Sequence, residues 1–507
     1  MTLLNREEAV AFARNHQYKL LIGGKLCTAI DGSTMESIDP STGKVITSVP
    51  KAGPQDVMKA VEAAKSAQPA WGALSIRERR TYYQALADAI APHRDALAVL
   101  DAVDSGNPLN AMVKDVDYVF AQLSDWPALA MSLAGQTLPV TAEGLHYTAY
   151  RPYGVVGRIV PFNHPALFAI CGFGAALMAG NTMVLKVADQ TPLSALYLGE
   201  IINKILPPGV LNILSGGPDV GDAIVTHPVI KRVGFTGSGA VGQLIQQRAA
   251  SVGVKHVSLE LGGKNPLIVF PDADLDKAVA GAIHGMNFGV CQGQSCGSNS
   301  RILIHSSVHD DFVERMRSAI ESIVVGRAYD PGTQMGPLVS RKQYDRVLGY
   351  IDQGKASGAK LVTGGSRPSH LDEQGYFIAP TVFSNVDMSM SIAKEEIFGP
   401  VVSVSSWNDY DMMLQQANDV EYGLTASIWS EDISLALKTA ERIEAGYIWV
   451  NDANRHYWGV PFGGMKNSGL GREESMHELL SYMELQAINV IMKDPRTRLA
   501  EMTGNEP

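Results

Sequence analysis

The feature that most constrains the fold is an alternation of short apolar runs with longer amphipathic stretches between about residues 155 and 270. The apolar runs include GVVGRIV, NTMVLKV, GVLNIL and RVGFTG, and helix-type stretches such as 191–205 separate them. Strands that are buried on both faces and joined by helices form parallel sheets. The pattern therefore predicts an α/β fold in which helices cover both faces of a parallel sheet.

A second alternating series follows the first. It comprises a helix that opens at DADLDKAVAGAIHG, the strand SRILIH, the helix VHDDFVERMRSAIESI, a further helix near 340–356, and the strands LTASIWS and YIWVN. The chain has 507 residues, which is enough for more than one hydrophobic core. Two α/β lobes explain this length and pattern better than one.

Two β-rich runs interrupt this alternation of strands and helices: residues 131–150 and the segment SYMELQAINVIM near the C-terminus. Neither has a partner strand close to it in the sequence. Because unpaired strand edges often pair with another subunit, these runs predict an oligomerisation element.

Composition excludes several classes of function. The formal net charge of -10 argues against nucleic acid as the main partner. No apolar run reaches the roughly 18 residues that a membrane span needs, and the start MTLLNREEAVAFARNHQ has acids where a signal peptide is apolar, so we expect a cytoplasmic protein. The four cysteines form no CxxC pair, which argues against a disulfide framework or a zinc site.

Cys296 is the first candidate for chemistry. It lies in GQSCGS between Gly293 and Gly297, in a loop between a helix and a strand, where a thiol can face a substrate. The alternative is that a cysteine is only a small buried hydrophobic residue, which remains the interpretation of Cys291, Cys171 and Cys27 from the residues alone. A thiol of ordinary pKa is mostly protonated at neutral pH, so a nucleophilic role requires a nearby base.

Three further segments offer partners for this thiol. Glu260, in LELGGKNP, ends a predicted strand, and the carboxyl ends of parallel strands line the ligand crevice of α/β proteins; a solvated or salt-bridged glutamate is the alternative. Asn163, in PFNHP, can donate to an oxygen that gains negative charge, or can simply form a turn. The run GFTGSGAVGQ leads from a strand into a helix whose amides can face a pyrophosphate, although it matches neither G-x-G-x-x-G nor a P-loop.

Together these segments resemble the aldehyde dehydrogenase superfamily, in its NAD-dependent, hydrolytic form. The resemblance extends from IGGK near residue 22 to PFGGMKNSGLGRE at 461–473, and LELGGKNP and GQSC at this separation are its most specific motifs. It implies two Rossmann-like parallel-sheet lobes, one for the cofactor and one catalytic, with a small β-rich oligomerisation element. The implied domains are 1–130 and 151–259 for NAD binding, 260–463 for catalysis, and 131–150 with 476–495 for oligomerisation.

The resemblance also implies residue roles. Cys296 would attack the aldehyde, Glu260 would activate water to hydrolyse the thioester, and Asn163 would stabilise the oxyanion, with no metal. The implied cofactor is NAD, with NADP less favoured, because the acid at Asp189 would repel a 2′-phosphate. The implied cofactor-binding residues are Lys186, Asp189, Gly217, Gly237, Ser238, Gly242, Leu261, Glu396, Phe398 and Phe162.

Some positions depart from the family pattern. His164 and His456 stand where many relatives have aromatic residues, and Phe162 replaces a common tryptophan. These changes predict a more polar substrate pocket that accepts an acidic or hydroxylated substrate, unless the histidines are merely packed as neutral rings. The predicted pocket residues are His164, Cys171, Arg455, His456 and Phe462.

The leading prediction is an NAD-dependent aldehyde dehydrogenase that produces a carboxylate from a small aldehyde and assembles as a homodimer or homotetramer. Three alternatives stay open from the sequence. They are a dehydrogenase that passes the acyl group to coenzyme A, a cysteine hydrolase or esterase without redox chemistry, and a non-catalytic protein that retains the fold. A water-activating Glu260 argues against the first, and the predicted cofactor segments argue against the second.

Overall fold

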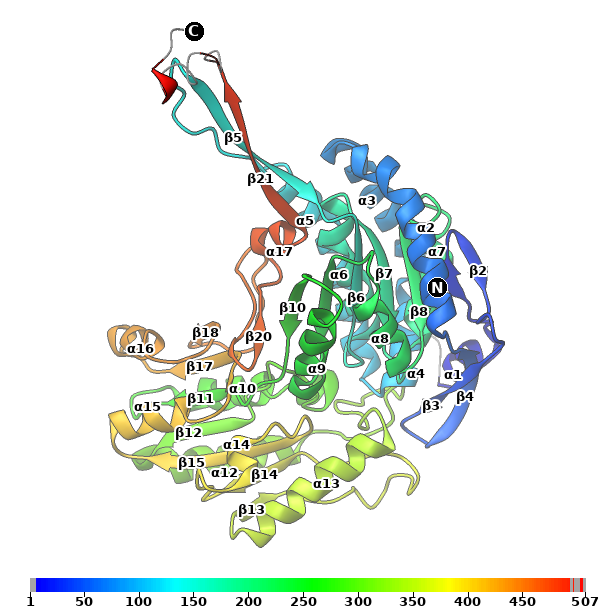
Figure 1. Ribbon diagram of the computed structural model, residues 1–507. Coiled ribbons are helices and arrows are strands. Elements are labelled where there is room, and N and C mark those ends of the chain that lie inside the picture. Colours follow the sequence, from blue (N-terminus) through cyan, green and yellow to red (C-terminus); the bar gives the residue numbers. More distant parts are fainter. Residues whose placement is uncertain (1–5, 493–495, 497–501, 505–507) are drawn as a thin grey trace.

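The computed structural model describes residues 6–492, 496 and 502–504. Two large sheets form the cores of two lobes, and a long two-stranded ribbon projects from the first lobe (Figure 1). Smaller antiparallel pairs join β3 (Thr34–Asp39) to β4 (Lys44–Pro50) and β16 (Tyr422–Gly423) to β19 (Met465–Lys466).

The first sheet has eight strands in the order β2-β1-β8-β7-β6-β9-β10-β20. The run from β8 to β10 is parallel, and the two edges are antiparallel. Every residue of β6, β7, β8 and β9 is buried, as expected for central strands with helices on both faces. The strands are β1 (Leu20–Ile22), β2 (Lys25–Cys27), β6 (Val155–Ile159), β7 (Thr182–Val187), β8 (Leu211–Ser215), β9 (Arg232–Thr236), β10 (His256–Glu260) and β20 (Gly469–Leu470).

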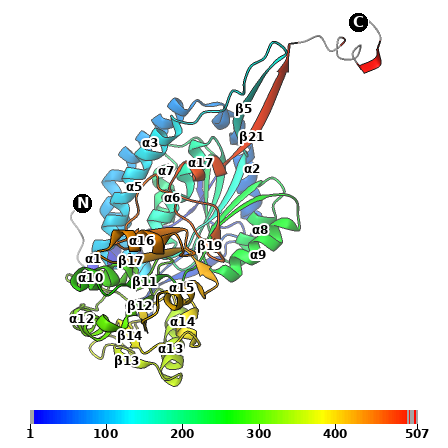
Figure 2. The same ribbon diagram turned by 90° about the vertical axis from the view of Figure 1, so that its left-hand side faces the viewer.

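Helices cover both faces of this sheet. Figure 2 shows α2, α8 and α9 on one side and α3, α5, α6 and α7 on the other. The helices of this lobe are α1 (Arg6–Asn15), α2 (Pro54–Ala73), α3 (Ile76–Ile90), α4 (Arg94–Ser105), α5 (Leu109–Ala130), α6 (Pro165–Met178), α7 (Leu193–Ile202), α8 (Pro218–Thr226) and α9 (Gly239–Ala250), with a 3-10 turn η1 (Ala91–His93).

Two buried aspartates of α4 fix the starts of neighbouring helices. Asp101 accepts a hydrogen bond of 3.0 Å from the backbone N–H of Ala166 in α6, and Asp104 accepts one of 3.0 Å from Leu193 in α7. Helix N-termini have unsatisfied N–H groups and a positive dipole end, so a carboxylate there is stabilising. Helix α6 begins two residues after Asn163, so this contact helps to position the loop that carries Asn163.

The second sheet has seven strands in the order β13-β14-β15-β12-β11-β17-β18, all parallel except β13. The predicted α/β fold with two parallel-sheet lobes is therefore confirmed. The strands are β11 (Pro266–Val269), β12 (Arg301–His305), β13 (Lys360–Thr363), β14 (Thr381–Ser384), β15 (Val401–Trp407), β17 (Thr425–Trp429) and β18 (Tyr447–Val450). The helices are α10 (Leu275–Gly285), α11 (Phe288–Cys291), α12 (His309–Glu321), α13 (Arg341–Ala356), α14 (Ser391–Lys394), α15 (Tyr410–Asn418) and α16 (Ile433–Ala440), with a 3-10 turn η2 (Ser306–Val308).

The strands of the two sheets occupy separate parts of the sequence, with one exception. All strands of the second sheet lie between residues 266 and 450, whereas β20, at 469–470, returns to the first sheet and pairs with β10. Leu259 lies opposite Leu470, and Glu260 lies opposite Gly469. The boundary at residue 260 stays a prediction, but the pairing ties the end of β10 to the C-terminal part of the chain.

The projecting ribbon consists of β5 (Gly144–Pro152) and β21 (Met483–Ile491), which follows α17 (Met476–Ser481). The two strands pair antiparallel along their full length, from Met483 opposite Pro152 to Ile491 opposite Gly144. The two β-rich runs that lack a partner nearby in the sequence thus pair with each other. Of the predicted oligomerisation element, residues 493–495 lie outside the described residues.

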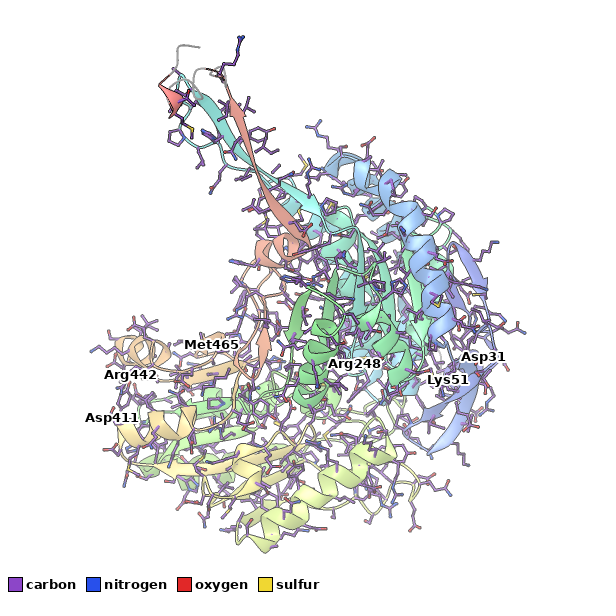
Figure 3. All side chains as sticks on the ribbon, in the orientation of Figure 1. Asp31, Lys51, Arg248, Asp411, Arg442 and Met465 are labelled. Atoms are coloured by element: carbon purple, nitrogen blue, oxygen red, sulfur yellow. The ribbon has the colours of Figure 1, made fainter. Side chains whose placement is uncertain are left out.

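Ion pairs on the surface lie away from the interior of the lobes. Arg442 and Asp411 form such a pair at 2.9 Å on the second lobe (Figure 3). Exposed pairs of this kind contribute little to stability.

Within the described part of the chain, no helix is both long and apolar enough to cross a membrane, and no group of His, Cys, Asp and Glu side chains is arranged to hold a metal ion.

Candidate active site

A cleft opens at the carboxyl end of the first sheet, where α/β proteins bind ligands. Three predicted catalytic residues, Cys296, Glu260 and Asn163, line this one cleft. Its other lining residues are Pro161, Phe162, Phe168, Thr236, Gly237, Ser238, Leu261, Gly262, Gln343, Arg346, Glu396 and Phe398. The structure therefore brings together residues that lie far apart in the sequence.

Cys296 lies in the loop between α11 and β12. Its side chain is partly exposed and packs against an apolar cluster made of Leu424, Tyr447, Trp449 and Phe462. Burial raises the pKa of the thiol, and the charge of Glu260 adds to this shift. The thiol is therefore protonated at neutral pH and needs a base to become a nucleophile.

Hydrogen bonds fix the backbone of this loop. Asn265 donates from Nδ2 to the carbonyl oxygen of Cys296 at 2.7 Å. Gln294 donates from Nε2 to the Cys291 carbonyl at 3.1 Å and accepts at Oε1 from the Val339 N–H at 3.1 Å. The sulfur is thus carried on a backbone that is held from several sides.

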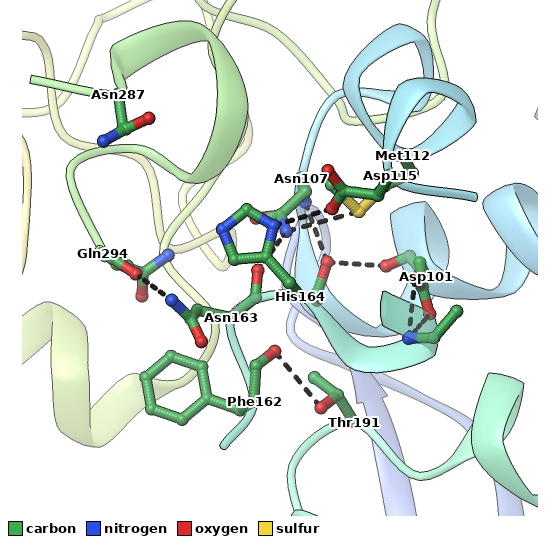
Figure 4. Close-up of polar contacts among 12 residues, drawn as sticks. Asp101, Asn107, Met112, Asp115, Phe162, Asn163, His164, Thr191, Asn287 and Gln294 are labelled. Carbon is green, nitrogen blue, oxygen red and sulfur yellow. Dashed lines mark hydrogen bonds and ion pairs between the residues drawn. The ribbon is translucent and has the colours of Figure 1, made fainter. Parts of the chain in front are cut away.

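Asn163 lies between β6 and α6, and one hydrogen bond holds its side-chain amide while another holds its backbone (Figure 4). Its Nδ2 donates to the backbone carbonyl of Gln294 at 2.9 Å, and its backbone carbonyl accepts from Asn107 Nδ2 at 2.7 Å. One N–H of the amide is used to hold the Cys296 loop. The other N–H is left to donate to an oxygen in the cleft, because an amide nitrogen carries two protons.

Glu260 is the last residue of β10 and is buried, with 5% of its surface exposed. Burial raises the pKa of its carboxyl well above the usual value, and the charge of Glu473 raises it further, whereas Arg158 and Arg472 lower it. Its Oε2 makes no hydrogen bond in the described structure. A carboxylate whose pKa lies closer to neutrality is a stronger base once it is deprotonated.

Arg158 and Glu473 form a buried ion pair beside this carboxyl, with 2.6 Å between Arg158 Nη2 and Glu473 Oε1. Sequence patterns did not indicate this pair, because the two residues lie on β6 and in the loop after β20. Its charges influence the pKa of Glu260 in opposite directions. The ion pair is therefore part of the electrostatic environment of the candidate base.

The helix terminus predicted to face a pyrophosphate, at the start of α9, lies at the cleft, which Gly237 and Ser238 line. Ser238 is the N-cap of α9, and its side chain makes no capping hydrogen bond. Gly237 precedes it, and a Cβ atom at Gly242 would overlap the side chain of Leu261, so glycine at 242 permits this close packing. Gly217 is the N-cap of α8.

Lys186 and Asp189 lie near each other beyond the end of the cleft. Lys186 is buried in β7, where burial lowers its pKa and the charge of Asp189 opposes that change. Asp189 is exposed and lines a neighbouring depression with Glu36 and Lys342, separate from the cleft that contains Cys296. The two predicted ribose-binding residues thus occupy the rim of the first lobe.

Glu396 enters the cleft from the second lobe. Its Oε1 accepts a hydrogen bond of 3.0 Å from the N–H of Gly263, and a Cβ atom at Gly262 would overlap its carboxylate. The carboxylate of Glu396 can come this close to the LELGGKNP segment only because Gly262 has no side chain. Burial raises the pKa of Glu396 to about 7, although Gly263 and the charges of Arg346 and Lys264 lower it.

Phe398 has a left-handed backbone, with φ of 59°, which is unusual for a bulky residue. Gln343 holds it by donating from Nε2 to the Phe398 carbonyl at 2.6 Å. The ring meets that of Phe162 edge to face, with centroids 5.8 Å apart. Gln343 was not predicted from the sequence, since it lies on α13, 55 positions from Phe398.

The predicted pocket residues fall into two groups. His164, His456 and Phe462 gather beside the cleft, as do the carboxylates Asp115 and Glu474, which no sequence pattern indicated. Cys171, on α6, lies within electrostatic range of Glu474, and burial raises the pKa of its thiol well above the usual value. Arg455, in contrast, is exposed, with its guanidinium 6.0 Å from the centre of the Tyr457 ring.

The aldehyde dehydrogenase family model matches residues 28–488. An aldehyde dehydrogenase named tropH from Talaromyces stipitatus is 42% identical over 481 residues, which cover 93% of each chain. The human protein named retinaldehyde dehydrogenase 3 is 40% identical over 482 residues, 94% of this chain and 93% of its own. A solved structure described as the NAD+ complex of aldehyde dehydrogenase from Bacillus cereus superposes with a TM-score of 0.93 at 39% identity, over 97% of this chain and 100% of that one.

These matches confirm the resemblance that the motifs LELGGKNP and GQSC indicated, and they extend it over nearly the whole chain. On the family model, the sequence identities and the shared two-lobed fold, this chain belongs to the aldehyde dehydrogenase family.

Proposed function

We propose that the protein oxidises an aldehyde to a carboxylic acid with NAD, through a covalent thioester on Cys296. The observation that carries the proposal is that Cys296, Glu260 and Asn163 line a single cleft. The overall reaction converts an aldehyde, NAD+ and water into a carboxylic acid, NADH and a proton. The hydrolytic step distinguishes this activity from transfer to coenzyme A.

In the first step, Cys296 Sγ bonds to the carbonyl carbon of the aldehyde. The thiol must lose its proton, and Glu260 is the carboxyl group of the same cleft that can accept it. The carbonyl oxygen gains negative charge, and the free N–H of the Asn163 amide donates to it. A donor that is already oriented, as this amide is by its hydrogen bond to Gln294, stabilises such charge without reorganisation.

When NAD is bound, its nicotinamide accepts the hydride that leaves the thiohemiacetal carbon, so that a thioester to Cys296 remains. Glu260 releases the thiol proton to solvent, which is the proton of the overall reaction. It then takes a proton from water, and the resulting hydroxide attacks the thioester. The carboxylic acid leaves, and Sγ recovers a proton. The raised pKa of Glu260 suits both proton transfers, since the group exchanges protons closer to neutral pH than an exposed glutamate does.

The residues around the cleft fit a dinucleotide. The N-terminus of α9, at Ser238, offers backbone N–H groups and a positive dipole end to a pyrophosphate, and Gly217, at the start of α8, would flank the adenine. Glu396 would bind the nicotinamide ribose, while Lys186 would bind the adenosine ribose. Phe398 and Phe162 would pack beside the nicotinamide, and Leu261 and Gly237 would line its approach.

The activity test is direct. Purified protein given NAD and a panel of aldehydes should form NADH, detected by its near-ultraviolet absorbance, without added coenzyme A. Turnover that depends on coenzyme A would favour the acyl-transfer alternative. Ester cleavage without any NAD effect and without NADH formation would favour a hydrolase.

Cofactor choice should depend on Asp189. At a separation of about 4 Å and an effective dielectric constant of about 20, a carboxylate and one phosphate charge repel by about 4 kcal/mol, and exposure to salt screens most of this. We expect Asp189→Asn to raise the ratio of kcat/KM for NADP over NAD by about tenfold, equivalent to about 1.4 kcal/mol. Initial rates with both cofactors measure the ratio. Because asparagine keeps a hydrogen-bonding side chain, an unchanged ratio would show that the charge of Asp189 does not select the cofactor.

We also propose that the protein is a homodimer or homotetramer in which the β5–β21 ribbon contacts another subunit. A two-stranded ribbon is marginally stable alone. Its strands and the preceding loop expose apolar side chains: Leu138, Val140, Leu485, Val490 and Ile491. Burial of this surface against a second copy of the chain would stabilise both the ribbon and the assembly.

Charges on the ribbon should therefore weaken assembly. The double variant Leu485→Glu with Ile491→Glu is expected to shift the molar mass toward that of a monomer, because two buried carboxylates are costly at an apolar contact. Size-exclusion chromatography with light scattering measures the mass. Leu437→Glu, at an equally exposed leucine on α16, is the control. A monomeric parent protein, or an unchanged mass in the double variant, would contradict the proposal.

A further inference from the structure

Two histidine–carboxylate pairs lie beside the cleft. His164 Nδ1 is 2.6 Å from Asp115 Oδ2, and His456 Nδ1 is 2.9 Å from Glu474 Oε1. Figure 4 shows the first pair, in which Asp115 reaches from α5 to the histidine at the start of α6. We call these four residues the histidine recess.

The recess is separated from the thiol by one layer of aromatic rings. The His456 ring lies 4.6 Å from that of Phe462 and is stacked on Tyr447 at 5.9 Å between centroids. Phe462 and Tyr447 belong to the cluster against which Cys296 packs. A substrate whose carbonyl is at the sulfur and that reaches past these rings would meet His456.

The second histidine approaches the same space from the first lobe. His164 follows Asn163 directly, and its ring meets Phe168, a lining residue of the cleft, at 5.9 Å. The two histidines are close enough for the charge of His164 to affect the pKa of His456. Both side chains stay accessible, at 17% for His164 and 30% for His456. They are thus set within the protein yet open to a small molecule.

The carboxylates determine which ring nitrogen can meet a ligand. A carboxylate only accepts hydrogen bonds, so Nδ1 of each ring carries the proton and Nε2 is directed elsewhere. Burial would lower the pKa of each imidazole, but Asp115 raises that of His164 and Glu474 raises that of His456, and both pKa values end above the ordinary value. A raised pKa favours the doubly protonated ring, in which Nε2 is also a donor. His164 also hydrogen-bonds the side chain of Cys291.

The charges of the recess compensate one another. Each imidazolium has its own carboxylate at hydrogen-bonding distance. An anionic substrate group would meet Asp115 and Glu474, and a cationic group would meet two imidazolium rings, so neither gains a net attraction. An alkyl group would cover the Nε2 donor of His456 and leave it without an acceptor, which is costly. A neutral oxygen accepts hydrogen bonds from the ring donors of the histidine recess without adding a charge.

From this geometry we propose that the substrate is an uncharged aldehyde that carries a hydroxyl group beyond its carbonyl, held by His456 and His164. The proposal rests on the proposed function, since it concerns the same site. It narrows the earlier expectation of an acidic or hydroxylated substrate to the hydroxylated class. His456 and His164 are here specificity residues, separate from the three that perform the chemistry.

The test compares two aldehydes of nearly equal shape. In 4-(hydroxymethyl)benzaldehyde a hydroxyl replaces the terminal methyl of 4-ethylbenzaldehyde, and the methylene group insulates the carbonyl from the change. With NAD, we expect kcat/KM for the hydroxylated compound to be higher by about tenfold or more, since sites built to bond a hydroxyl reject analogues without one. The 3-substituted pair extends the comparison to a second position. A ratio below about threefold for both pairs would overturn the proposal.

Charged analogues provide the remaining comparisons. The 4-(carboxymethyl) and 4-(trimethylammoniomethyl) benzaldehydes should both be poorer substrates than the hydroxymethyl compound. A preference for either charged analogue would overturn the proposal while leaving the aldehyde dehydrogenase activity intact. Formation of no NADH from any of the compounds would instead overturn the proposed function, and this inference with it.

Variants assign the preference to the recess. His456→Phe is expected to reduce the hydroxymethyl-to-ethyl ratio to near unity, mainly by raising KM for the hydroxylated compound, while turnover of 4-ethylbenzaldehyde persists. His456→Gln keeps a donor and should restore part of the ratio. His305→Phe, at the far end of β12 from the Cys296 loop, is the control and should leave the ratio unchanged. Retention of the full ratio in both His456→Phe and His164→Phe would contradict the assignment.

Discussion

Replacement of Cys296 by alanine is expected to abolish aldehyde oxidation, with a loss of at least about 10⁴-fold in kcat, because no covalent intermediate can form without the sulfur. Neither of the other groups in the cleft replaces it: Asn163 is an amide, and Glu260 is a buried carboxyl whose raised pKa favours its protonated form. The measurement is the initial rate of NADH formation with a saturating aldehyde.

A binding measurement separates loss of chemistry from loss of the site. NAD affinity, followed by quenching of tryptophan fluorescence, should change little in Cys296→Ala. Cys27→Ala, at an edge strand of the first sheet, removes a thiol elsewhere and should retain the parental rate. If the Cys296→Ala protein kept more than a hundredth of the activity, the covalent mechanism would have to be abandoned.

The second large effect concerns Glu260. Glu260→Gln is expected to slow steady-state turnover by about 10²- to 10⁴-fold, the usual range for the loss of a general base. Glutamine keeps the size of the side chain but cannot take a proton from water, so the thioester on Cys296 should accumulate. A rapid initial burst of NADH and a mass increase on the peptide that contains Cys296 would report this intermediate.

The pH dependence gives an independent check of the same residue. Glu260 must be deprotonated to act as a base, and burial raises its pKa, so kcat of the parent protein should increase as the pH rises through that raised pKa. This increase of kcat with pH should be absent in Glu260→Gln. Glu441→Gln, at an exposed residue after α16, should retain it. A variant with the parental pH profile would remove Glu260 from the mechanism.

The sequence predicted the fold well where neighbouring residues determine it. Buried strands such as NTMVLKV and GVLNIL and the helices between them are readable from local periodicity, and the two parallel-sheet lobes are confirmed. The partner of residues 144–152 was not readable, because β21 lies more than 300 positions later. Register between distant strands depends on the whole topology, which no local pattern encodes.

The candidate site shows the same limit at the level of side chains. The motifs indicated Cys296, Glu260 and Asn163, and their roles stay predictions, although all three line one cleft. The carboxylates Asp115 and Glu474 were missed, since each reaches its histidine from a separate segment.

Arg455 is predicted to line the substrate pocket because it is next to His456 in the sequence. Consecutive residues of an extended chain direct their side chains to opposite sides. The structure accordingly places Arg455 on the surface, over the Tyr457 ring, while the His456 ring points toward Glu474.

The pairing of β10 with β20 has a consequence for how the protein is made. A nascent chain emerging from the ribosome exposes β10 long before residues 469–470 are translated. Until then the first sheet has an open parallel edge at Glu260, which invites association with other strands. Synthesis of residues 469–470 closes that edge, so a chain that terminates before them lacks both the closure and a fixed position for Glu260.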